Sequence, residues 1–151
     1  MDKSKIIVRT MTLDDIPAVG EIERQSFSIP WSENAFEESL GYSHAIFLVA
    51  AYQEKIVGYC GMYQVFQEGD IINVAVMPEY RKQGVGRCLM EGMIQAALER
   101  NILDLTLEVR ESNEAAKRLY VSFGFESVGV RKNFYEKPKE NAIIMWKRDM
   151  K

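Results

Sequence analysis

A short loop of glycines and basic residues is the part of this sequence with the most evident chemistry. Gly84 and Gly86 follow Arg81 and Lys82, and a strongly helical stretch begins directly after them. Glycine lets a backbone come close to a ligand, and the unpaired N–H groups and positive dipole of a helix start favour phosphates. The pattern therefore predicts a phosphate site, although a simple glycine turn beside solvated basic residues has the same pattern.

Two familiar phosphate-binding motifs do not fit this loop. A dinucleotide fingerprint needs a third glycine three residues after Gly86 and a β-α-β setting, and a triphosphate loop ends in Gly-Lys followed by Ser or Thr. The sequence instead has Arg81 three residues ahead of the Gly-x-Gly pair, with a strand at 73–76 and Met77-Pro78 before it. That arrangement matches neither the dinucleotide fingerprint nor the triphosphate loop.

Glu108 and Tyr120 are the candidate catalytic side chains. In residues 103–110 the odd positions are apolar and the even ones, including Glu108, are polar, which predicts a strand whose polar face carries Glu108. A carboxylate near the C-terminal end of a strand, where open sheets bind ligands, can act as a general base. From the pattern alone, a solvated carboxylate paired with Arg110 is the simpler interpretation. Tyr120 can protonate a leaving group or be a core aromatic of the next helix.

The cysteines and the single histidine restrict other chemistry. Cys60, Cys88 and His44 are the only residues of these types, which excludes most zinc sites and leaves no evident Cys/His pair, so no metal is expected. Cys88 lies beside the glycine loop, where a covalent route through the thiol is conceivable, but no histidine is near in sequence to activate it. A buried, inert cysteine is the simpler reading, and His44 has no assigned role.

Length and charge indicate one ordinary cytoplasmic domain spanning residues 1–151. The chain is 47% hydrophobic and 27% charged, with a net charge of −3, which suits a globular core and argues against general nucleic-acid binding. The N-terminus lacks an apolar signal segment. The longest apolar run, 45–52, is far shorter than the ~20 residues that span a bilayer.

The elements expected around these residues make a mixed α/β fold with helices on the faces of its sheet. Turns at 53–54 and 68–70 predict an antiparallel meander of three strands ahead of the glycine loop. The expected strands are 6–9, 45–52, 55–66, 71–77, 102–110, 125–135 and 142–146, and the expected helices run to 26 and over 33–40, 85–100 and 113–123.

Several of these segments together resemble one known family. Residues 73–87 look like the cofactor-binding motif of the GNAT acetyltransferase superfamily, and 107–113 and 119–125 extend the likeness. With Pro30-Trp31-Ser32 and 142–145, they resemble the ribosomal-protein-alanine N-acetyltransferase (RimI) family over nearly the whole chain. The resemblance implies a single GNAT domain, with a mixed, mostly antiparallel sheet splayed between its fourth and fifth strands.

The resemblance also implies roles for individual residues. It implies acetyl-CoA as co-substrate, Glu108 as base acting through water, and Tyr120 as acid, with direct transfer in a ternary complex. The implied acceptor is the N-terminus of small-subunit ribosomal protein eighteen. The implied coenzyme-binding residues are Val74, Ala75 and Val76 through their backbone, Arg81, Lys82, Gln83, Gly84, Val85, Gly86 and Arg87 at the pyrophosphate, and Asn113 at the pantetheine.

The choice of acceptor is the least determined property. Phe134 stands where the family often has tyrosine, and the hairpin 136–140 has its own composition. Another amine, such as a lysine side chain or a small metabolite, remains an alternative, as does an acyl-CoA-binding module without catalysis. Two residue sets are candidates for the acceptor side, each with a plain structural reading as core or solvated face: the aromatics Trp31, Tyr63, Phe134 and Tyr135, and the acidic Glu33, Glu37 and Glu38.

Overall fold

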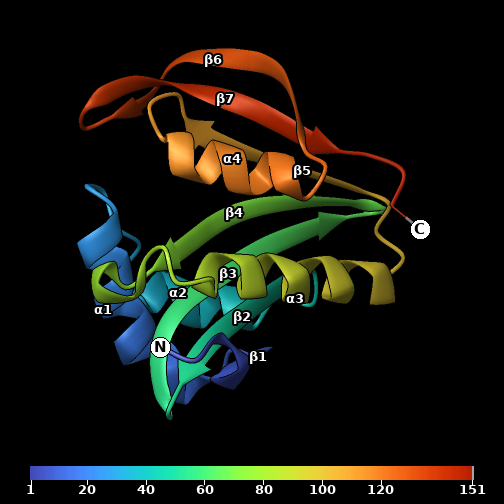
Figure 1. The fold of residues 1–151 in the computed structure, drawn as a ribbon. Coiled ribbons are helices and arrows are strands. Elements are labelled where there is room, and N and C mark those ends of the chain that lie inside the picture. Colours follow the sequence, from blue (N-terminus) through green and yellow to red (C-terminus); the bar gives the residue numbers. More distant parts are fainter. Residues whose placement is uncertain (151) are drawn as a thin grey trace.

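One seven-stranded sheet organises the chain in this computed structural model, which describes residues 1–150 (Figure 1). The strand order is β1-β2-β3-β4-β5-β7-β6, antiparallel throughout except for the parallel pair β4 and β5. The strands are β1 Ile6–Thr10, β2 Ala45–Tyr52, β3 Lys55–Val65, β4 Glu68–Val76, β5 Asp104–Arg110, β6 Glu126–Glu136 and β7 Lys139–Lys147. The helices are α1 Ile16–Ser26, α2 Glu33–Leu40, α3 Val85–Glu99 and α4 Glu114–Ser122, with short 3-10 turns at Lys3–Lys5, Leu13–Asp15 and Pro78–Tyr80.

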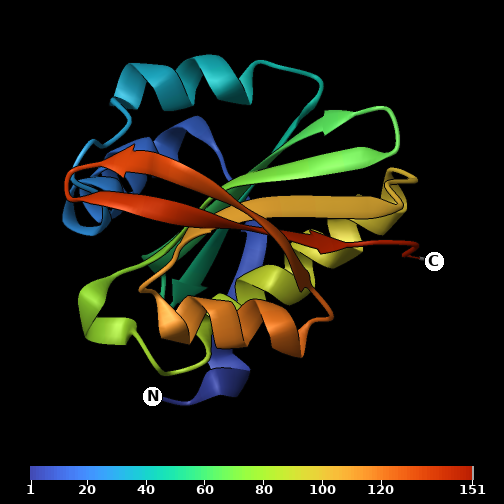
Figure 2. The same cartoon turned by 90° about the horizontal axis from the view of Figure 1, so that it is seen from above.

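The helices cover the two faces of the sheet in pairs. The core on one face contains α3 residues such as Leu89 and Met93 and α4 residue Tyr120, while the core on the other contains Val19 of α1 and Phe36 of α2. Seen from above, α2 lies on one side of the strands and α3 and α4 on the other (Figure 2). This is the mixed α/β arrangement that the sequence predicts.

The predicted turn at 68–70 is wrong, because these residues begin β4. Glu68 pairs with Val65 across the hairpin and with Asp104 of the parallel neighbour β5. The chain turns instead at Phe66 and Gln67, and Phe66 has a φ of 54°. The last hairpin is likewise tighter than predicted, since β7 begins at Lys139 and not at residue 142.

The sheet opens between β4 and β5, as expected. Their pairing stops at Ile71 and Leu107, after which the strands diverge toward their C-terminal ends (Figure 1). A bulge in the β3–β4 register leaves Ile72 opposite no partner, and such an extra residue bends a strand. Beyond that point β5 stays paired with β7, so β4 presents a free backbone edge toward the opening.

Candidate active site

Glu108 lies at the beginning of this opening. It is the first β5 residue beyond the last β4 pairing, and its side chain is on the α1/α2 face, opposite the buried Leu107 and Val109. The side chain is 25% exposed, and Oε2 is 3.7 Å from Nη1 of Arg131, beyond hydrogen-bond length. That oxygen is buried and has no hydrogen-bond partner among the described residues. A carboxylate oxygen left free in this way can accept a proton or a water molecule.

The charges that act on Glu108 come from the strands β4 and β6. Burial raises the pKa of Glu108, the positive charge of Arg131 on β6 opposes that rise, and Asp70 on β4 adds to it. Asp70 pairs with Thr106, two residues before Glu108 on the same face. Burial raises the pKa of Asp70 too, again against the charge of Arg131. The sequence reasoning missed Asp70, because it lay in the supposed turn, and Arg131, because nothing local links β6 to Glu108.

Tyr120 reaches the opening from the other face. It is 7% exposed, on the side of α4 that packs against the sheet, with its ring 5.9 Å from that of Phe125. Burial raises its pKa, and nearby Cys60 and Tyr135 add to the rise. The hydroxyl therefore keeps its proton at neutral pH and is available as a donor. Tyr120 is thus a core aromatic as well as a candidate acid.

The glycine loop ends in a helix start with free backbone donors. Gly84 is the N-cap of α3 with a φ of 91°, in the left-handed region that favours glycine. The first helical hydrogen bond runs from Cys88 N to Gly84 O at 3.1 Å, so the N–H groups of Val85, Gly86 and Arg87 precede it. Since glycine has no side chain to cap them, these donors can receive an anion.

The basic side chains of the loop are partly engaged by the protein itself. Arg81 Nε donates to Val76 O at 3.2 Å, at the end of β4. Arg87 donates to Ser122 Oγ at 3.0 Å and lies over the ring of Phe123. The structure thus brings Arg81 to the free edge of β4 and holds Arg87 against the end of α4.

The other predicted coenzyme-binding residues also border the opening. Asn113 is the N-cap of α4, and its Oδ1 accepts from Ala116 N at 3.1 Å, which leaves its amide NH2 unused by the cap. Val74 and Val76 are half-buried while Ala75 is 5% exposed. The loss of β5 as a neighbour leaves Val74 and Val76 partly uncovered.

A buried carboxylate fixes the loop between α1 and α2. Glu23, only 2% exposed, accepts from Trp31 N at 2.8 Å and from the hydroxyl of Tyr59. Asn73, beside the β4 bulge, donates to that hydroxyl at 3.1 Å. Burial raises the pKa of Glu23. The network ties the α1–α2 loop to the strand that borders the opening.

The other residues singled out in the sequence, Cys88, His44 and Trp31, lie among side chains of the protein's own structure. Cys88 is half-exposed and not buried as predicted, although the adjacent Leu89 is fully buried; burial, and then the charge of Glu91, raise the pKa of its thiol. His44 stacks on Tyr42 with ring centres 5.1 Å apart. Trp31 packs on Phe36 at the edge of the α1/α2 core. Within residues 1–150 there is no cluster of three potential metal ligands and no helix long and apolar enough to cross a membrane.

Comparison with known proteins agrees with this geometry. Residues 16–125 match the model of the acetyltransferase (GNAT) family. A Bacillus subtilis protein, provisionally described as a ribosomal protein bS18-alanine N-acetyltransferase, is 41% identical over 95% of this chain and 96% of its own. The bS18-alanine N-acetyltransferase of Escherichia coli K12 is 36% identical over 91% and 94% of the two chains.

The same relationship appears in three dimensions. The crystal structure of the ribosomal-protein-S18-alanine N-acetyltransferase from Escherichia coli superimposes with a TM-score of 0.88 at 32% identity, covering 97% of this chain and 95% of the other. The family match spans most of the chain, including the glycine loop, Glu108 and Tyr120. The chain therefore belongs to the GNAT acetyltransferase family and is an N-acetyltransferase, similar to the enzymes that modify ribosomal protein bS18.

Proposed function

We propose that this enzyme transfers the acetyl group of acetyl-CoA to a protein N-terminus, and that the acceptor is the N-terminal alanine of ribosomal protein bS18. The observation that carries the proposal is the similarity to bS18-alanine N-acetyltransferases over more than nine-tenths of each chain. Such an acceptor would place the enzyme in the cytoplasm.

The residues that border the opening suit acetyl-CoA. The free N–H groups at 85–87 match the pyrophosphate, assisted by the backbone of Lys82 and Gln83 and by the charge of Arg81. The uncovered edge of β4 offers the backbone groups of Val74 and Val76 to the pantetheine and to the thioester oxygen, with Ala75 between them bonded to β3, and an N–H at this edge would stabilise developing negative charge. The amide NH2 of Asn113 is available to the pantetheine arm.

Glu108 acts in this proposal as the general base. An α-amine has an ordinary pKa near ~7.7–8.0, against ~10.4 for lysine, so a chain terminus needs less help to become a nucleophile. Glu108 has a raised pKa and an oxygen free of hydrogen bonds, which suits it to take the amine proton through a water molecule. Tyr120, which keeps its proton, donates it to the departing thiolate. The amine attacks the thioester directly while both substrates are bound.

A peptide-acetylation assay tests the proposal. Purified enzyme with acetyl-CoA and a peptide carrying the bS18 N-terminus should release one thiol per N-terminal acetyl group found by mass spectrometry. The same peptide with its α-amine blocked, but with its lysines free, should not react. Glu108→Gln should reduce turnover by about 10²-fold or more, while the matched control Glu111→Gln, on the exposed turn after β5, should not. Acetylation of lysines alone, or of neither amine, would refute the assignment.

A further inference from the structure

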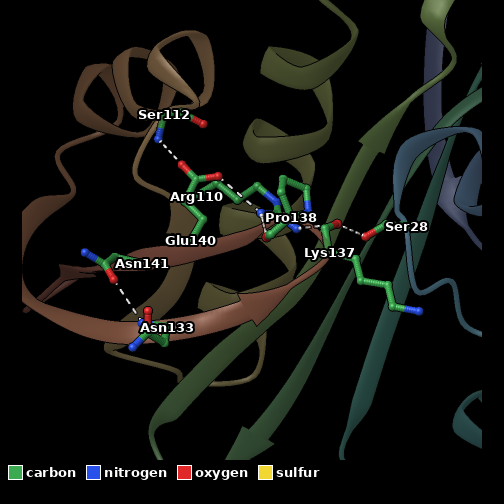
Figure 3. Close-up of polar contacts among 8 residues, drawn as sticks. All are labelled: Ser28, Arg110, Ser112, Asn133, Lys137, Pro138, Glu140 and Asn141. Atoms are coloured by element: carbon green, nitrogen blue, oxygen red, sulfur yellow. Dashed lines mark hydrogen bonds and ion pairs between the residues drawn. The ribbon is translucent and has the colours of Figure 1, made fainter.

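The hairpin joining β6 and β7 is held by one arginine from β5. Nη1 of Arg110 donates to the carbonyl oxygen of Pro138 at 2.9 Å and to Oε1 of Glu140 at 3.1 Å, and Nη2 donates to the carbonyl oxygen of Lys137 at 3.3 Å. The guanidinium also lies over the ring of Tyr135, 4.2 Å from its centre. One side chain thereby fixes both carbonyls of the turn (Figure 3).

Two more hydrogen bonds connect the hairpin to the start of α4 and to the α1–α2 loop. Oε2 of Glu140 accepts from Ser112 N at 2.6 Å, next to the start of α4. Ser28, in the loop between α1 and α2, donates through its hydroxyl to the carbonyl oxygen of Lys137 (Figure 3). The bond from Ser112, and then Arg110, lower the pKa of Glu140. We call this set, Ser28, Arg110, Glu140 and the carbonyls of Lys137 and Pro138, the hairpin clasp.

The hairpin clasp lies on the side of the opening from which an acceptor would reach Glu108. Helices α3 and α4 cover one face of the sheet, and the glycine loop and Asn113 lie at their N-terminal ends. Glu108 is on the other face, two residues before Arg110. The Ser28 bond joins the hairpin tip to the α1–α2 loop, which Glu23 ties to the protein interior through Trp31. The acceptor therefore reaches Glu108 beneath or beside this bridge.

We propose that Arg110 and Glu140 are positioning residues that set the wall of the acceptor entrance and so determine how tightly a peptide acceptor binds. This inference rests on the proposed function, in which the acceptor is a protein N-terminus. The two side chains are half-buried, 27% and 18% exposed, and both carboxylate oxygens and both terminal guanidinium nitrogens are used. Such charge-assisted, fork-shaped contacts hold a fixed geometry.

Arginine is required by this geometry. A lysine ammonium has no plane to stack on Tyr135 and cannot direct parallel donors at two carbonyls and a carboxylate. Loss of Arg110 also leaves the half-buried Glu140 without its cation. The hairpin should then move away from the α1–α2 loop, while the loop at 81–87 and the edge of β4 remain in place.

Steady-state kinetics with the bS18 peptide test this role. Arg110→Met and Arg110→Lys should each raise the KM for peptide by about tenfold, and leave the KM for acetyl-CoA within about twofold. Lys139→Ala, which removes an exposed charge from the same hairpin, is the matched control and should change neither constant. An equal rise in both KM values, or an unchanged peptide KM in both Arg110 variants, would overturn the proposal.

Two further measurements separate this inference from the proposed function. Ser28→Ala should raise the peptide KM less than Arg110→Met, and the double variant should be less than additive, since both act on the same hairpin. Amide hydrogen exchange should be faster at 133–140 in Arg110→Met without peptide, whether or not bS18 is the acceptor. Unchanged exchange there would refute the clasp, while its acceleration with no turnover of any N-terminal peptide would refute only the proposed function.

Discussion

The pH dependence of turnover should respond in opposite directions to two changes beside Glu108. In the proposed mechanism Glu108 is the base and must be deprotonated to act, so activity falls as the pH drops through its pKa. Arg131 lowers that pKa and Asp70 raises it. Arg131→Met should therefore move the acid limb of the profile to higher pH, and Asp70→Asn should move it to lower pH.

The size of the first shift follows from the distance between the charges. Arg131 Nη1 lies 3.7 Å from Glu108 Oε2, and the arginine side chain is 57% exposed. At that separation a water-like dielectric gives about 1 kcal/mol, which corresponds to about 0.7 pH unit. The exposure of Arg131 favours this water-like value over larger interior ones. Asp70 lies opposite Thr106, two residues before Glu108, so its effect should be smaller.

The assay is the pH profile of kcat/KM with one peptide for all variants. The amine of the peptide contributes the same limb in every case, so differences between profiles report on the enzyme. Arg118→Met and Glu126→Gln, which remove exposed charges from α4 and from the start of β6, are matched controls. A 13C NMR titration of the Glu108 carboxyl measures the same pKa without turnover.

Three outcomes would refute this reasoning. Shifts of the same sign for Arg131→Met and Asp70→Asn would show that neither charge acts through Glu108. An acid limb that moves as far in the control variants would indicate a general charge effect. A carboxyl titration that moves while the kinetic profile does not would show that Glu108 is not the base.

Three other changes test separate parts of the structure. Tyr120→Phe should lower kcat by about 10²-fold with little change in the acetyl-CoA KM, measured at saturating peptide. Gly84→Ala should cost about 1 kcal/mol because its φ is 91°, lower Tm by about 3 °C and raise the acetyl-CoA KM. Arg9 lowers the pKa of Asp15, so this pair stabilises the fold at neutral pH and stops doing so as the pH falls below ~4; Arg9→Met should flatten that part of the acid-unfolding curve.

The sequence was most informative where the signal is local. The alternation in 103–110 predicted a strand with Glu108 on its less buried face, and the burial of β5 alternates accordingly. Ser32 and Asn113, residue types favoured at helix N-caps, cap α2 and α4 with their side chains. Patterns of this kind depend on a few neighbouring residues, so they can be read without knowing the fold.

The errors and omissions arise where the partner is distant in sequence. Glu68-Gly69-Asp70 has the composition of a turn, yet the parallel neighbour that makes it a strand lies 36 positions further on, at Asp104. The same pairing puts Asp70 beside Glu108. The hairpin clasp joins Ser28 to Lys137, 109 positions apart. Most hydrogen bonds of the hairpin clasp are to backbone carbonyls, so the amino-acid composition gives no sign of these bonds.

The position at which β4 and β5 part explains why one site can serve two substrates. Past Ile71 and Leu107 the sheet no longer separates its two faces, so the α1/α2 side and the α3/α4 side meet there. Glu108 belongs to the first side and Tyr120 to the second. In the proposed reaction, an amine that arrives beneath the hairpin meets the base, and a thiolate that departs toward α3 and α4 meets the acid.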